Sequence, residues 1–220
     1  MRQSRTKQLT VLAMLSAVAY LVMALIHFPV VSLLGFTLEY EPKMIVITIA
    51  GFLYGPISAF AVSAVVCLVE MITVSASGWI GAVMNLLACA AFSCTAAFVY
   101  KRSRNLAGAV AGLVLGIIML TAVMLLWNYL LTPIYLNMPR DAVVPLLVPA
   151  ILPFNLIKGG INAAVIMLIY KPVTVALRKS GLMPAPENAP KSKANIGIIL
   201  VSVFVLVTCV LFVLVLQKIL

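Results

Sequence analysis

Residues 152–172, LPFNLIKGGINAAVIMLIYKP, form an apolar run long enough to cross a membrane as a helix, and polar side chains lie in its first turns. A lysine inside hydrocarbon costs roughly 2.5 to 3.5 kcal/mol on insertion scales, so Lys158 needs a partner or a water-filled cavity. Asn155, Lys158 and Asn162 are spaced by three and four residues and therefore share one helical face. This face predicts a site with a small, convergent set of hydrogen-bonding groups.

The composition indicates an α-helical integral membrane protein. Of 220 residues, 65% are hydrophobic and only 9% are charged, whereas a soluble domain has about 25% charged residues. The apolar runs are long and unbroken, unlike the alternating pattern of a transmembrane β-barrel. The formal net charge of +10 comes from basic residues at the ends of apolar runs, where they set topology, so we expect no nucleic-acid binding.

Apolar runs separated by basic or proline-bearing stretches predict six helices and one further segment. The first run is longer than the apolar core of a signal peptide, so we expect a retained helix. Residues 27–42 are neither apolar enough nor long enough to cross a membrane, and we expect an ordered loop on its surface. The expected helices cover residues 9–26, 43–53, 57–74, 79–99, 106–131 and 146–170, and a last apolar run covers residues 196–216.

These runs divide the chain into three expected parts. They are a six-helix membrane domain at residues 1–178, a basic linker containing prolines at 179–195, and an additional C-terminal transmembrane helix at 196–220. Basic residues are concentrated at the ends of helices that share a side with the N-terminus, and Lys43, Arg140 and Lys218 are those expected on the other side. This bias predicts a multi-pass protein of the cell membrane with a cytoplasmic N-terminus.

Several polar residues inside the expected helices fall at one depth, near the outer helix ends. They come from four helices, and the loop bearing Glu39, Tyr40 and Glu41 lies above them. Such an arrangement predicts a pocket open to the exterior. Two alternatives stay open, namely a structural ion pair between Lys158 and Glu70, and asparagines that merely join helices. The residues at this depth are Glu70, Asn85, Asn128, Asn155, Lys158 and Asn162.

Small residues predict where helices approach closely. Gly108, Gly112 and Gly116 form two successive GxxxG steps, and we expect another helix of the same chain to pack there rather than a second copy. Ala13 and Ala17 form an AxxxA step for which no close partner within the chain is implied. This face of the first helix is therefore available to a helix of another protein.

Motifs for catalysis or metal binding are absent from the sequence. We find no nucleotide-binding P-loop, no zinc-protease motif, no serine-hydrolase elbow and no paired carboxylates. The cysteines fall inside apolar segments at irregular spacing, which favours buried thiols over disulfides or metal ligands. We therefore expect neither an enzyme nor a metal protein.

Four features together resemble one family of membrane proteins. They are the short basic N-terminus, the AxxxA step, GFLYGP at residues 51–56 and PFNLIKGGINAAVIMLIYKP at residues 153–172. Over about residues 5–178 the chain resembles the substrate-binding S components of energy-coupling factor (ECF) vitamin transporters, and within them the riboflavin-specific members. The last apolar run departs from the six-helix pattern of that family.

The resemblance implies a protein that captures riboflavin from outside with high affinity and associates, through its first helix, with a transmembrane coupling protein and two ABC-type ATPases. An asparagine amide complements the alternating acceptors and donor of the flavin pyrimidine edge, and a lysine donates to a carbonyl. By this resemblance, and for Asn85 by depth, the substrate-binding candidates are Leu38, Glu39, Tyr40, Asn85, Asn128, Asn155, Lys158 and Asn162, and the coupling residues are Ala13 and Ala17.

Other functions compete with this one. The ligand could instead be flavin mononucleotide, or another vitamin such as thiamine, folate, pantothenate or biotin. A cationic vitamin would favour acidic and aromatic groups, whereas Lys158 and the asparagines suit a neutral ring rich in acceptors. A self-powered secondary carrier would need coupling-ion residues in the inner half of the membrane. A membrane-anchored structural protein would need no polar layer.

Overall fold

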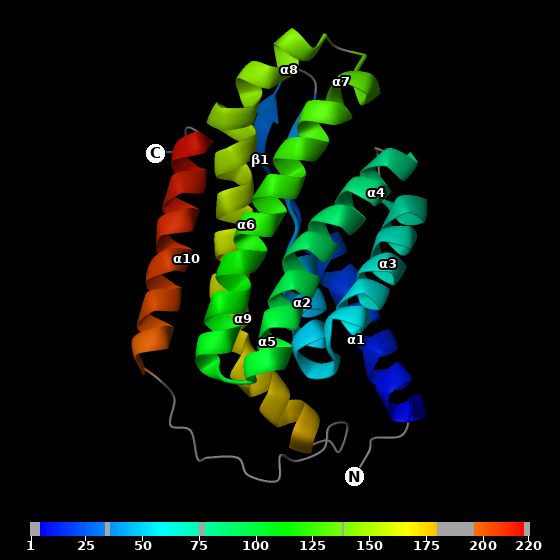
Figure 1. Cartoon of the computed structure of the whole chain (residues 1–220), viewed down its shortest axis with the longest axis vertical. Coiled ribbons are helices and arrows are strands. Elements are labelled where there is room, and N and C mark those ends of the chain that lie inside the picture. The colour runs from blue at the N-terminus through cyan, green and yellow to red at the C-terminus, as the bar shows by residue number, and fades with distance from the viewer. Residues whose placement is uncertain (1–4, 34–35, 75–77, 138, 180–195, 218–220) are drawn as a thin grey trace.

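The chain folds into a bundle of long helices, and a two-stranded hairpin covers part of one end (Figure 1). This computed structural model describes residues 5–33, 36–74, 78–137, 139–179 and 196–217. Among these residues, five helical stretches are long and apolar enough to cross a membrane. They are α1 (Arg5–Leu25), α3 (Pro56–Thr73), α4 (Gly78–Cys89) with its continuations η1 (Ala90–Cys94) and α5 (Thr95–Ser103), α6 (Leu106–Leu130), and α8 (Arg140–Leu146) with η2 (Leu147–Ile151) and α9 (Leu152–Lys179).

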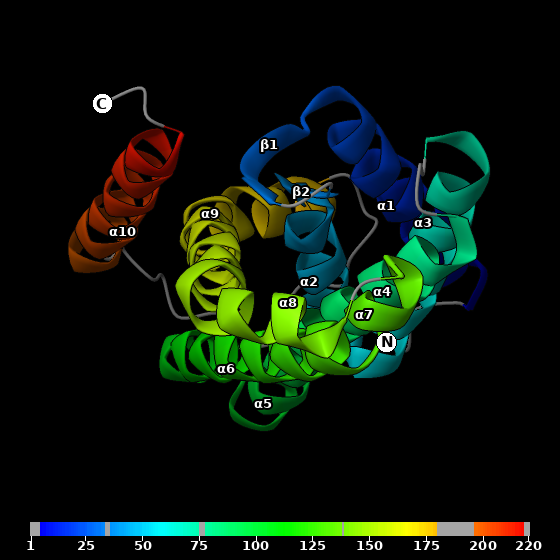
Figure 2. The same cartoon turned by 90° about the horizontal axis from the view of Figure 1, so that it is seen from above.

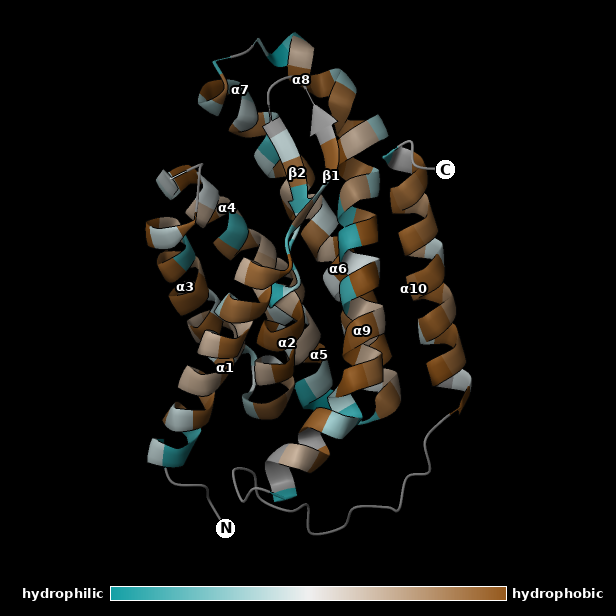
Figure 3. Cartoon of the chain, turned by 180° about the vertical axis from the view of Figure 1, so that it is seen from behind, coloured by the Kyte–Doolittle hydropathy of each residue, from teal (hydrophilic) through white to brown (hydrophobic). Residues whose placement is uncertain are grey.

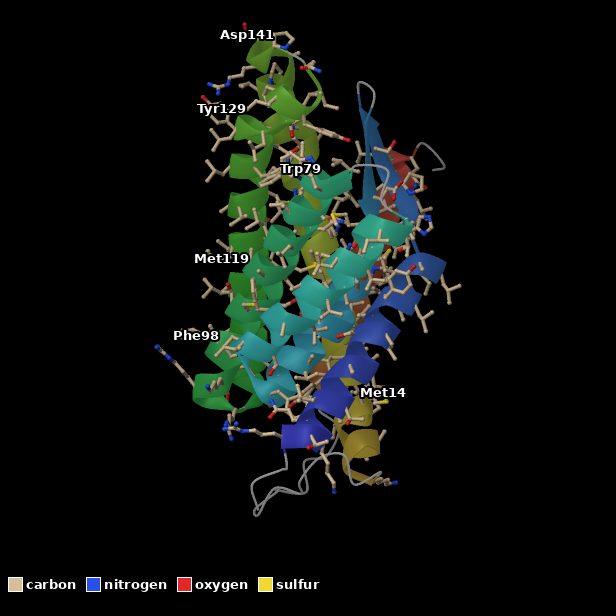
Figure 4. All side chains as sticks on the ribbon, turned by 90° about the vertical axis from the view of Figure 1, so that its right-hand side faces the viewer. Met14, Trp79, Phe98, Met119, Tyr129 and Asp141 are labelled. Atoms are coloured by element: carbon tan, nitrogen blue, oxygen red, sulfur yellow. The ribbon has the colours of Figure 1, made fainter. Side chains whose placement is uncertain are left out.

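The outer surface of the bundle suits lipid. Met14, Phe98 and Met119 point outward from their helices (Figure 4), and 40 to 49% of each of these residues is exposed. Hydrophobic residues dominate the helices, while hydrophilic residues of α4 and α9 lie at the height of the hairpin (Figure 3). The expected all-helical membrane architecture is thus confirmed for a multi-pass membrane protein.

The short helix α2 (Lys43–Tyr54) lies at the centre of the bundle. It is apolar on every side, and each residue from Lys43 to Phe52 is buried, as expected for a helix without a polar face. Gly55 ends it with a φ of 98°, a conformation that glycine adopts without strain, and Pro56 begins α3. GFLYGP thus ends in a tight turn between α2 and α3.

The prediction of a surface loop at residues 27–42 is wrong. Strands β1 (Phe28–Leu33) and β2 (Phe36–Tyr40) pair antiparallel, with Phe28 opposite Tyr40 and an irregularity between Pro29 and Val31. Alternating β-branched and aromatic residues explain the strands. Val30 and Tyr40 are buried against Phe154, Ile157 and Ile161 of α9, so the hairpin is part of the packed core.

Prolines explain why the helix expected at 146–170 has different limits. Pro145, Pro149 and Pro153 recur every four residues, and each lacks the backbone N–H that an α-helix needs. The segment therefore passes through the π-helical stretch η2 between α8 and α9. Helical structure begins at Arg140 and continues through Pro172 to Lys179. A further short helix, α7 (Thr132–Tyr135), precedes it.

The GxxxG face of α6 packs inside the chain, as expected. A Cβ atom built on Gly112 would lie 2.7 Å from the backbone oxygen of Ala96, and one on Gly116 would lie 2.9 Å from that of Phe92. Both contacts are with backbone of η1 and α5, so the glycines allow two helices to approach within van der Waals distance.

The last helix, α10 (Ile196–Leu216), lies at the edge of the bundle beside α9 (Figure 2). Val213 packs into the cluster that holds the hairpin. The side-chain amide of Gln217 donates a hydrogen bond to the carbonyl of Pro29 in β1. The C-terminal end of α10 thus contacts both α9 and the hairpin.

We expect Gly112→Leu to destabilise the protein by about 1–3 kcal/mol or more, because overpacking against backbone cannot be relieved by a side-chain rotation. Ala111→Leu is the control, since Ala111 is exposed on the same helix. Thermal unfolding of both variants in detergent measures the difference. Equal midpoints would contradict the close packing of α6 on α5.

Candidate functional site

A cavity of about 510 Å³ opens between the hairpin and the ends of α1, α3, α4, α6, α7 and α9. Its volume falls in the range of about 300–1,000 Å³ that is usual for small-molecule pockets. The lining combines polar and apolar side chains. The polar ones are His27, Thr37, Glu39, Glu41, Glu70, Asn85, Asn128, Tyr135, Asn155 and Lys158.

Six of the eight residues predicted to bind substrate line this cavity. Tyr40 and Asn162 do not, because they face each other behind its wall, where the Tyr40 hydroxyl donates to Asn162 Oδ1 at 3.2 Å. Met44 of α2 also lies against Asn162, with 3.7 Å between Nδ2 and Sδ. The residues in the lining are Leu38, Glu39, Asn85, Asn128, Asn155 and Lys158.

The asparagines of α6 and α9 are oriented mainly by their own helices. Asn155 Nδ2 donates to the backbone oxygen of Ile151 at 2.8 Å, and Asn128 Nδ2 donates to that of Met124 at 2.7 Å. Thr132 then donates to Asn128 Oδ1 at 2.9 Å. These bonds are local, so neither side chain serves mainly to join two long helices. The carboxamides are held in place at the cavity wall.

Lys43 is the residue whose position differs most from the prediction. We expected it at the outer membrane surface, yet it is fully buried. Its ammonium lies 2.9 Å from a Glu41 carboxylate oxygen and 2.5 Å from one of Glu70. The ion pair considered between Lys158 and Glu70 is therefore wrong, because Glu70 pairs with Lys43. Asn85 Nδ2 donates to the other oxygen of Glu70 at 2.7 Å.

Lys158 makes only longer contacts. Its ammonium is 3.7 Å from Glu41 Oε2 and 3.4 Å from the backbone oxygen of Glu39, and it lies 5.6 Å from the centre of the Phe154 ring. Short N–H···O hydrogen bonds span about 2.7–3.2 Å. The ammonium therefore lies in the cavity wall with weakly engaged donors.

Two pKa shifts outside the spanning helices describe the electrostatics. Burial alone would raise the pKa of the Glu41 carboxyl, but Lys158 and Lys43 outweigh it and hold this pKa below its ordinary value. Glu41 is therefore a carboxylate at neutral pH. Burial raises the pKa of the Tyr40 phenol, so Tyr40 keeps the proton that it donates to Asn162.

Sequence reasoning missed the apolar part of the cavity and four of its polar groups, which are His27, Thr37, Glu41 and Tyr135. Met23, Met84 and Met124 line it from three helices, and thioether side chains adapt to the shape of a ligand. His27 and Glu41 also line it, although the sequence predicted only a surface loop at residues 27–42. His27 directly precedes β1 and Glu41 directly follows β2. A sequence prediction of a hairpin in place of a loop would have placed both residues beside the site.

The lining of the cavity determines what kind of ligand it can hold. No group of three metal-ligating side chains occurs among the residues that the structure describes. The cysteines of that part are free thiols: Cys67, Cys89, Cys94 and Cys209. The lining combines amides and charges with methionine and aliphatic groups, and such a mixture can hold a ring with one polar and one apolar edge.

The predicted coupling residues lie away from this cavity. Ala13 and Ala17 are exposed on α1, whereas Val11, Leu15 and Ala19 of the same helix are buried against the bundle. The outer face of α1 therefore presents Ala13 and Ala17 beside Met14, Val18 and Leu21, and no described element covers it.

Comparisons with known proteins agree with this architecture. Residues 7–170 match the family described as ECF transporter, substrate-specific component. The chain is 32% identical to riboflavin transporter FmnP of Bacillus subtilis (strain 168), over 76% of this chain and 91% of that protein. It is 31% identical to riboflavin transporter RibU of Staphylococcus aureus (strain TCH60), over 81% of this chain and 96% of that one.

A solved structure is also similar. The structure titled "Structure and mechanism of the S component of a bacterial ECF transporter" superposes with a TM-score of 0.67 at 30% identity, covering 80% of this chain and 99% of that one. The family match spans the helices that build the cavity, and the likeness extends over the whole neighbouring chain. The protein belongs to the family of substrate-specific components of ECF transporters.

Proposed function

We propose that this chain is the high-affinity riboflavin-binding S component of an ECF-type transporter, which captures the vitamin from the exterior for ATP-driven uptake by partner subunits. The observation that carries the proposal is the cavity in which Asn128, Asn155 and Lys158 converge beneath the hairpin. The two relatives named as riboflavin transporters support the identity of the vitamin.

The chemistry of the cavity suits the flavin ring. Asn155 and Lys158 provide a carboxamide and an ammonium for the carbonyls and N–H of the pyrimidine edge. Met84, Leu120 and Met124 also line the cavity, and they would bury the dimethylbenzene edge. Leu38 and Glu39 of β2 cover the site, and Tyr40 supports them through its bond to Asn162.

Charge favours riboflavin over flavin mononucleotide as the ligand. Glu39, Glu41 and Glu70 all line the cavity, and a phosphate group would meet these carboxylates at short range in a poorly solvated space. We therefore place flavin mononucleotide second. The other vitamins and the secondary carrier have no specific observation in their favour, and we assign no catalytic activity to the chain.

The orientation and the partners follow from the same proposal. The N-terminus lies in the cytoplasm, so the hairpin end faces outside. The outer face of α1, with Ala13 and Ala17, contacts the transmembrane coupling protein, which carries two ABC-type ATPases. Small residues permit such close helix packing.

The division of the chain into parts is also a proposal. Residues 1–178 form the substrate-binding domain, residues 179–195 a linker, and residues 196–220 an additional transmembrane helix. The family match ends at residue 170, and α10 begins beyond it.

Lys158→Ala is expected to weaken riboflavin binding by about tenfold or more, because a hydrogen bond to a charged group contributes about 1.5–3 kcal/mol. Asn155→Ala is expected to have a smaller effect, since the lost bond is between neutral groups. Titration of purified protein by flavin fluorescence quenching measures both dissociation constants. Lys171→Ala, an exposed lysine at the other end of α9, is the control. Wild-type affinity in both cavity variants, with folding verified, would remove these residues from the site.

Replacing both Ala13 and Ala17 with leucine should leave riboflavin affinity unchanged and abolish uptake, because bulky side chains prevent close approach of a partner helix. Uptake of labelled riboflavin in cells that express the ECF module tests this, alongside binding by the purified variant. Ala61→Leu, at an exposed position on α3, controls for a bulky residue on the lipid-facing surface. Normal uptake by the double variant would mean that α1 does not couple in this way.

A chain ending at Lys179 should still bind riboflavin saturably, because none of the α10 residues that the structure describes lines the cavity. Gln217→Ala in the full chain isolates the hydrogen bond to Pro29. Titration of both proteins measures their dissociation constants. If the truncated protein is monodisperse but does not bind, then α10 belongs to the binding unit and the proposed division is wrong.

A further inference from the structure

Lys43, Glu41, Glu70 and Lys158 form a buried charge cluster at the edge of the cavity. Three of them line the cavity, whereas Lys43 does not. The cluster brings together the end of the hairpin, α2, α3 and α9, and it contains two cations and two carboxylates. Charges taken out of water must be compensated within the protein, and the formal charges of these four groups sum to zero.

The two lysines of the cluster differ in how closely they approach the carboxylates. Lys43 is the close partner of both carboxylates, at 2.9 Å from Glu41 and 2.5 Å from Glu70, and Asn85 also binds Glu70. Lys158 lies 3.7 Å from Glu41 although it is nearly as buried as its neighbours. Lys43 thus pairs with both anions, although Glu41 Oε2 accepts no hydrogen bond. Lys158 keeps its donors weakly engaged at the cavity wall.

We propose that Lys43 is a positioning residue for ligand capture, which holds Glu41 and Glu70 so that the ammonium of Lys158 stays available to a carbonyl acceptor of the ligand. The inference rests on the proposed riboflavin-binding function and assigns a role to a residue outside the cavity lining. Lys43 acts through Lys158 and does not touch the ligand.

Removing the charge of Lys43 would leave Glu41 with Lys158 as its nearest cation. The remaining distance of 3.7 Å closes with a small side-chain movement, and attraction between unscreened buried charges favours that closure. The ligand carbonyl would then compete with a carboxylate for the same ammonium. The other titratable groups facing Lys43 are the thiols of Cys67 and Cys89, which cannot replace its positive charge.

The test compares two double variants with equal formal charge, K43M/E41Q and K43M/E70Q. In K43M/E41Q the carboxylate nearest to Lys158 is gone, so this variant should bind riboflavin more tightly than K43M/E70Q does, although Glu41 itself lines the cavity. In K43M/E70Q, Glu41 remains and pairs with Lys158, so affinity should stay roughly tenfold or more weaker. Lys43→Met alone should be at least as weak as K43M/E70Q.

Titration of each purified protein with riboflavin measures the dissociation constants, and thermal unfolding verifies the fold. If both double variants recover equally, charge balance alone matters and the proposal is overturned. If neither recovers, or if Lys43→Met binds as tightly as the wild type, Lys43 has no positioning role. The comparison of the two double variants needs no single variant, so an unfolded Lys43→Met protein does not prevent it.

Failure of this inference is distinguishable from failure of the proposed function. Wild-type protein that does not bind riboflavin would overturn the function. Wild-type protein that binds, with double variants that do not differ, would overturn only the role of Lys43.

Discussion

The buried ion pairs of Lys43 with Glu41 and Glu70 hold together the elements that define the cavity. Glu41 follows β2 directly, Lys43 begins α2, and Glu70 lies near the end of α3, so one ammonium fixes three segments. Removing one partner from a buried pair typically costs about 3–5 kcal/mol, because an uncompensated charge remains. The hairpin also packs on α9 through apolar contacts and through the hydrogen bond from Tyr40 to Asn162, and the ion pairs fix its end to α2 and α3.

The face of α9 could be predicted because its information is local. Asn155, Lys158 and Asn162 lie on one side of any regular helix, whatever surrounds it. Their depth in the membrane followed from counting residues from the helix ends, and it brought Asn85 and Asn128 to the same level. Glycine spacing on α6 is equally local, and its contacts with Ala96 and Phe92 lie within the chain.

The pairing of charges could not be predicted, because it depends on distances between elements far apart in the sequence. Lys43 stands at the start of a short apolar run, where a lysine normally marks the membrane surface. Only the burial of α2 at the bundle centre brings it between Glu41 and Glu70. The same burial shows why Asn162 lies behind the cavity wall, since Met44 and Tyr40 cover it. The alternation of residues in 28–40 is typical of strands, but the segment's short length and its polarity favoured the prediction of a surface loop.

The additional helix α10 is compatible with the proposed coupling surface because of where it packs. Its contacts are with α9 and β1, and Figure 2 shows α10 and α1 at different sides of the bundle. Ala13 and Ala17 therefore remain exposed on α1 in the presence of α10. A helix packed on α1 would have closed the AxxxA face to a partner, whereas one packed on α9 leaves it open. The chain can thus carry a helix beyond the family match without losing the surface through which we propose it is energised.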